Sequence, residues 1–126
     1  MFFHVLITIL FLIVLGTLFM TVFYALSARG NSEAKRKHRK WGWITLWFTL
    51  AAVGSVETMV RLEHDVVRPP LFRIHLPCGI IFLLSLITLL KFNGEKYPMF
   101  HRILGYVSVG AYLCTFVTGM VLLWYY

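Results

Sequence analysis

The five histidines are the residues of this 126-residue chain best suited to chemistry, because neutral imidazole binds metal ions and haem iron. His38 and His101 each stand just before a long apolar block, and His64 and His75 flank the segment between the second and third blocks. A haem iron held by two imidazoles needs one histidine from each of two facing helices, at the same depth. We therefore predict that His38 with His101, and His64 with His75, bind one or two b-type haems.

A repeated pattern surrounds the first histidine pair. The order His-Arg-x-x-Gly-aromatic occurs at residues 38–43 and again at 101–106. Arg39 and Arg102 are suited to bind haem propionates, because a guanidinium pairs well with carboxylates. Either arginine alone is also typical of the cytoplasmic side of a membrane protein. The repeat indicates a duplicated helical hairpin.

Three of the histidines are followed by a glycine four residues later. Residues four apart lie on one face of a helix, so these glycines are predicted to leave room for a flat porphyrin beside each imidazole. The alternative is that the glycines let helices pack closely, which is common in membrane bundles. The three are Gly42 after His38, Gly79 after His75 and Gly105 after His101.

A copper site is the second interpretation of the same residue types. His75 and Cys78 are three residues apart and can present an imidazole and a thiolate on one helical face, which suits a soft metal. Pro77 between them is expected to fit a helix only in its first turn. Cys78 and Cys114 lie in apolar blocks without a pairing pattern, so they predict no disulfide framework. The candidate copper ligands are His4, His64, His75 and Cys78.

Four long apolar blocks must position these residues. Apolar residues make up 60% of the chain and charged residues only 13%, and the mean hydropathy of +0.79 is that of a membrane protein. Each block approaches the roughly 20 residues that cross a bilayer as a helix. We predict an all-α, integral-membrane four-helix bundle in a single transmembrane domain, residues 1–126. Its expected spans are residues 1–28, 41–62, 74–92 and 103–126.

The charged residues predict the orientation of this bundle. Most lysines and arginines lie in the first and third loops, so the positive-inside rule places these loops in the cytoplasm and both termini on the outer, periplasmic or extracellular side. The same distribution explains the net charge of +7 without nucleic acid as a partner. Glu57 is predicted to pair with Arg61, four residues later, because an unpaired acid within a membrane is costly.

Short motifs occur in a characteristic order between residues 36 and 126. They are Lys37-His38-Arg39-Lys40, His64, Ile74-His75-Leu76, His101-Arg102, Tyr112 and Thr118-Gly119. This order resembles a family of small bacterial membrane proteins that includes the haem-copper oxidase maturation factor CtaM. The resemblance implies an inner-membrane protein that acts in terminal oxidase assembly or in haem and copper handling, with the four histidines as ligands. Members of that family have more N-terminal membrane sequence than the one span that carries His4 here.

Three functions therefore follow from the sequence. The leading hypothesis is a haem-binding protein of the bacterial inner membrane that acts in electron transfer or in maturation of a respiratory oxidase. The second is copper or cofactor handling during oxidase assembly. The third is a non-catalytic accessory subunit that packs against a larger membrane complex and holds lipid at its basic face. No nucleophile stands beside a histidine that could act as its base, so the sequence assigns no enzyme class.

Overall fold

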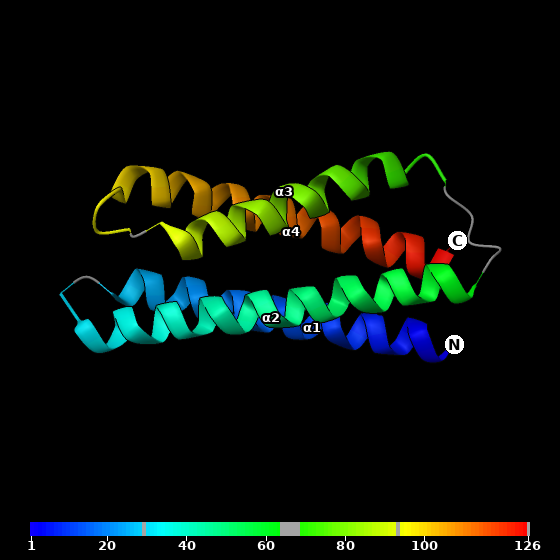
Figure 1. Ribbon diagram of the computed structural model, residues 1–126, viewed down its shortest axis with the longest axis horizontal. Helices are drawn as coiled ribbons and strands as arrows, with labels where there is room; N and C mark the ends of the chain where they lie inside the picture. Colours follow the sequence, from blue (N-terminus) through cyan, green and yellow to red (C-terminus); the bar gives the residue numbers. More distant parts are fainter. Residues whose placement is uncertain (29, 64–68, 93, 126) are drawn as a thin grey trace.

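The computed structural model contains four α-helices, and each runs antiparallel to the next along the chain (Figure 1). Each helix is long and apolar enough to span a membrane, as the sequence predicts. The described residues are 1–28, 30–63, 69–92 and 94–125. The helices are α1 (Phe2–Ser27), α2 (Ser32–Leu62), α3 (Phe72–Lys91) and α4 (Pro98–Tyr125).

Local sequence determines where the helices begin and end. Gly30 adopts a φ of +73° between α1 and α2, a conformation that glycine tolerates because it has no Cβ. The Asn31 side chain then caps α2, accepting hydrogen bonds from the backbone N–H groups of Glu33 at 3.0 Å and Ala34 at 3.2 Å. Because of this cap, α2 begins nine residues before the predicted span and includes the lysines and arginines of residues 35–40. At the other hairpin, α4 begins at Pro98, a residue favoured at the first position of a helix.

We expected a helix to accept Pro77 only in its first turn. The structure places Pro77 in the second turn of α3. Proline has no N–H group, so the backbone carbonyl of Arg73, four residues earlier, loses its helical donor. Such a loss is tolerated in membrane helices when neighbouring groups replace the bond. The helix therefore continues through Pro77 and keeps His75 and Cys78 on one element.

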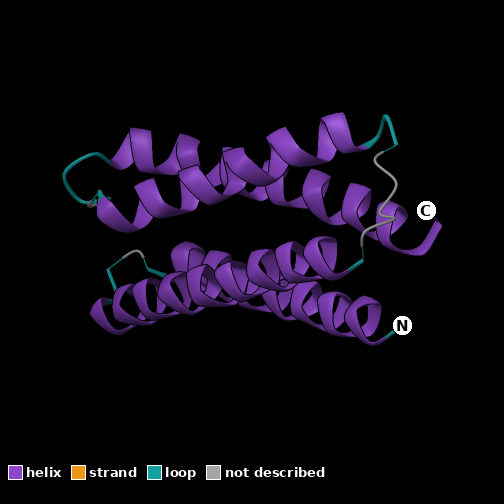
Figure 2. Ribbon diagram, turned by 45° about the vertical axis from the view of Figure 1, so that its right-hand side comes forward, coloured by secondary structure: helices purple, strands orange, loops and turns teal. Residues whose placement is uncertain are grey.

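The four helices form two hairpins, α1–α2 and α3–α4, which Figure 2 shows as two layers. Packing is most extensive within each hairpin and less extensive between them. Large apolar side chains such as Phe19 and Trp47 remain exposed on the outside, as expected for a surface that faces lipid. The buried core cluster consists of Val14, Leu18, Leu46, Phe82, Leu86 and Tyr112.

Both chain ends lie at one end of the bundle (Figure 1). We call this the terminal end. The opposite end carries the two short turns within the hairpins, and Lys35 Nζ of α2 lies 3.1 Å from Glu95 Oε1 of the α3–α4 turn there. We call it the basic end, defined by Lys35, Arg36, Lys37, Arg39, Lys40, Lys91, Lys96 and Arg102.

Candidate functional site

The structure brings His38 and His101 together at the basic end. His38 lies near the start of α2 and His101 near the start of α4, so one imidazole comes from each hairpin. Their ring centroids are 6.1 Å apart, and the ring planes are inclined by 70°. Both side chains are half-buried. The two rings thus face one another across the less extensively packed interface between the hairpins.

His38 is fixed by a bond to the neighbouring helix of its own hairpin. Its Nδ1 lies 2.7 Å from the backbone carbonyl oxygen of Thr21 in α1. A carbonyl oxygen only accepts hydrogen bonds, so Nδ1 carries the proton and Nε2 keeps its lone pair. Metal-bound histidines generally have this arrangement, in which one ring nitrogen donates to a carbonyl and the other binds the metal.

His101 is held within its own hairpin by packing and by a hydrogen bond to the backbone of Phe92 at the end of α3. Its ring lies against Gly94, where an added Cβ would meet His101 Cδ2 at 3.1 Å. Its Nδ1 is buried and has no hydrogen-bond partner. The same holds for Ser108 Oγ, which lies two turns further along α4. Gly105, between them in the sequence, has no neighbouring atom within 4 Å of an added Cβ. A stretch of α4 near His101 therefore combines unused polar atoms with open space.

The ring separation allows a direct test of whether one iron fits between the two imidazoles. An imidazole nitrogen binds a metal at about 2 Å, and the ring centre lies about 1 Å beyond it, so two imidazoles on one metal have centres about 6 Å apart. The observed 6.1 Å agrees with this requirement. Arg39 and Arg102 are exposed at the same end, beside these histidines in the sequence. The ring distance therefore matches a bis-histidine centre, and it is also the distance of an ordinary edge-on ring contact such as that of His4 with Trp124.

The glycines do not all lie where the sequence predicts. An added Cβ on Gly42 would be 3.1 Å from Leu90 Cδ2, so a leucine side chain fills that space. Gly79 faces Thr115 of α4, whose Cγ2 lies 3.6 Å from an added Cβ. Helical side chains lean towards the N-terminus of their helix, so an imidazole covers the preceding turn and not the residue four positions later. Of the three predicted glycines, only Gly105 has open space beside it.

At the terminal end, His75 is placed by α4. Its Nδ1 lies 2.9 Å from Thr118 Oγ1, and Thr118 donates its own hydroxyl proton to the Cys114 carbonyl at 2.7 Å. The hydroxyl oxygen therefore accepts from Nδ1, and the His75 side chain also forms a hydrogen bond with the backbone of Thr115. Its ring packs against Gly119, where an added Cβ would be 2.9 Å from His75 Cε1. His64 lies outside the described residues, so the pairing of His64 with His75 stays a prediction.

The candidate copper ligands do not gather within the described part of the chain, where no three metal-ligating side chains form a group. His4 stacks edge-on against Trp124 at 6.1 Å between ring centroids, and its buried Nδ1 has no partner. Cys78 contacts Cys114 on α4, with the two Sγ atoms 2.8 Å apart. Sequence reasoning missed this cysteine pair, because spacing along the chain does not show which helix faces meet.

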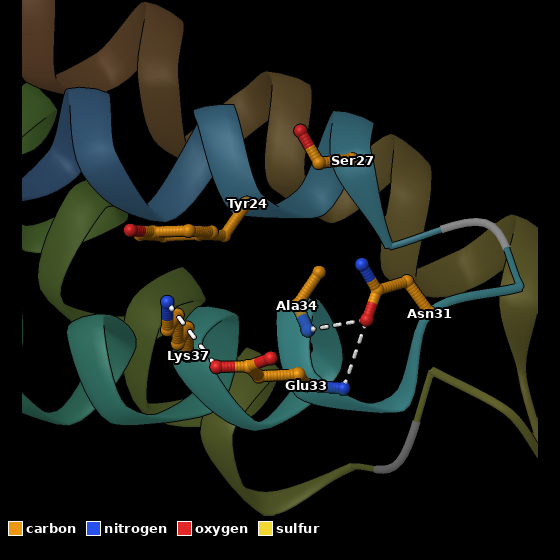
Figure 3. A pocket seen from close by; sticks show the side chains of 6 residues that line it. All are labelled: Tyr24, Ser27, Asn31, Glu33, Ala34 and Lys37. Carbon is orange, nitrogen blue, oxygen red and sulfur yellow. Dashed lines mark hydrogen bonds and ion pairs between the residues drawn. The ribbon is translucent and has the colours of Figure 1, made fainter.

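A small pocket near the basic end does not belong to this site (Figure 3). Its volume of about 130 Å³ is below the roughly 300–1,000 Å³ of typical ligand sites. Its polar groups also bind one another, since Lys37 pairs with Glu33 at 3.5 Å and lies 5.5 Å from the centre of the Tyr24 ring. The lining residues are Tyr24, Ser27, Asn31, Glu33, Ala34 and Lys37.

The candidate site is therefore the imidazole pair at the basic end, and the Thr21 carbonyl accepts the hydrogen bond that orients His38. No sequence signal identified Thr21, because the bond uses its backbone and not its side chain. No protein-family model, curated protein or solved structure matches this chain.

Proposed function

We propose that the chain binds a b-type haem between His38 and His101 and acts in electron transfer or in maturation of a respiratory terminal oxidase. The observation that carries this proposal is the 6.1 Å separation of the two imidazole rings. The bond from His38 Nδ1 to the Thr21 carbonyl supports it, because this bond leaves Nε2 free to bind iron.

Each residue at the site has a separate role in this proposal. His38 and His101 are the axial ligands, and the exposed guanidinium groups of Arg39 and Arg102 bind the propionates where the bundle meets the headgroups. The open space at Gly105 admits part of the porphyrin. Haem supplies one-electron chemistry when bound, and the protein sets its ligands, burial and charge.

The basic end faces the cytoplasm in this proposal. Lysines and arginines concentrate there, and both termini lie at the opposite end. A haem near one membrane face suits a carrier or an assembly factor, since electron transfer across the bilayer requires a second site near the other face. The motifs between residues 36 and 126 that resemble the CtaM family support the choice of oxidase maturation, and the partner is then a respiratory complex of the bacterial inner membrane.

Haem titration of the purified protein in detergent tests the proposal. We expect one haem per chain, with the reduced spectrum of a low-spin bis-histidine centre. His38→Ala and His101→Ala should each weaken haem binding by at least about tenfold and abolish the low-spin spectrum. His4→Ala is the matched control, because this half-buried imidazole lies at the terminal end and also has an unpartnered Nδ1. A Soret band that is unchanged in His101→Ala would refute the site.

A further inference from the structure

The two cysteines of the chain form a close contact between α3 and α4. Cys78 Sγ and Cys114 Sγ are 2.8 Å apart, although 36 residues separate them in the sequence. This separation exceeds the length of a disulfide bond by about 0.8 Å. Both thiols are free in this structure, and both side chains are half-buried.

Neighbouring contacts hold these thiols opposite one another. One turn before Cys78, His75 bonds to Thr118 of α4 at 2.9 Å. One residue after Cys78, Gly79 packs against Thr115, with 3.6 Å between an added Cβ and Thr115 Cγ2. Because contacts on either side fix the register of the two helices, the thiols meet in the folded protein and do not depend on a chance encounter.

We infer that Cys78 and Cys114 form a reversible disulfide within the membrane-spanning part of the α3–α4 hairpin. Both residues lie in helices that are apolar enough to span a bilayer. As oxidant we propose a lipid-soluble quinone, which reaches an apolar site and accepts two electrons and two protons. The two S–H bonds break, one S–S bond forms, and the quinone is reduced to the quinol.

A metal ion fits this thiol pair less well than a disulfide. Two thiolates that bind one metal at about 2.3 Å each, in tetrahedral or linear geometry, have sulfur atoms well over 3 Å apart. The observed Sγ–Sγ distance of 2.8 Å would have to increase for the two sulfur atoms to bind a metal, and to decrease for them to form a disulfide. No third ligating group joins the pair among the described residues. These distances favour the disulfide.

The experiment uses the full-length protein, reduced and then freed of reductant in detergent micelles. A short-chain ubiquinone analogue is added, and quinol absorbance, intact mass and maleimide labelling are measured. We expect one quinol per chain, a loss of two hydrogen atoms in mass, and a decrease in labelled thiols from two to none. Reaction with diamide but not with the quinone would refute the proposed oxidant, and two labelled thiols after both reagents would refute the disulfide.

Cys114→Ser is the control, and it should reduce no quinone and keep one labelled thiol. If that variant fails to fold, the mass of the wild-type chain still decides the question, because a monomer that lacks two hydrogens requires an internal disulfide. A disulfide-linked dimer as the main product would contradict the inference. The readouts do not involve haem, so they are independent of the proposed function.

Discussion

Gly119 gives the sharpest test of the packing around His75. An added Cβ at this position would be 2.8 Å from Phe11 Cε2 and 2.9 Å from His75 Cε1. Carbon atoms in contact are normally about 3.5–4.0 Å apart, so Gly119→Ala forces α1 and α3 away from α4 or displaces both rings. The bond to Thr118 restrains the His75 ring, so its displacement also loses a hydrogen bond. Overpacking of this kind costs about 1–3 kcal/mol in the free energy of unfolding.

Gly110→Ala is the matched control on the same helix. An added Cβ there meets no atom within 4 Å, so the substitution removes only the flexibility of glycine. Alanine is favoured over glycine inside a helix by about 0.5–1 kcal/mol, and we expect a gain of this order. Gly119→Ala gains the same helix propensity, so the two variants should differ in unfolding free energy by the overpacking cost alone, about 1–3 kcal/mol.

Unfolding in mixed micelles with increasing dodecyl sulfate, followed by helical circular dichroism, measures this difference. The comparison between two alanines on one helix cancels the effect of the detergent on helix propensity. If Gly119→Ala is as stable as Gly110→Ala, then α1, α3 and α4 do not meet at Gly119, and the His75 ring does not pack against this glycine.

Two further substitutions test individual polar contacts by the same unfolding assay. Tyr112 is 3% exposed and its hydroxyl donates to the backbone carbonyl of Phe11, so Tyr112→Phe should cost about 0.6 kcal/mol, the average for such bonds in membranes. Tyr106→Phe, at a side chain that is 73% exposed, should change nothing measurable. Asn31→Ala should cost about 1 kcal/mol because it removes the cap of α2, whereas Asn31→Asp keeps the acceptor and most of the stability. Equal losses for the two Asn31 variants would contradict the capping argument.

The features that the sequence predicts are those that depend on local pattern. The four helices follow from long apolar blocks, since lipid leaves the backbone no partners except its own. The pairing of Glu57 with Arg61 also follows, because residues four apart are neighbours on a helix, and the structure confirms it at 2.8 Å. α2 begins at Ser32, ahead of the predicted apolar span, because a charged, well-capped segment is helical outside the apolar block.

Contacts between helices were harder to predict, because they depend on how each helix is rotated about its axis. The contact of Cys78 with Cys114 and the packing of His75 on Gly119 both join α3 to α4, and spacing along either helix does not give this pairing. Spacing along one helix likewise did not show that Gly79 packs against Thr115 of α4, and its role beside a porphyrin stays a prediction.

The arrangement at the basic end places one imidazole from each hairpin at the less extensively packed interface. The α1–α2 hairpin orients His38 through the Thr21 carbonyl, and the α3–α4 hairpin orients His101 by packing against Gly94. Each imidazole is thus positioned within its own hairpin, and docking of the hairpins sets the distance and the inclination of the two rings. A site built in this way loses little conformational entropy when a ligand binds, and a ligand that spans the rings strengthens the interface that has the fewest other contacts.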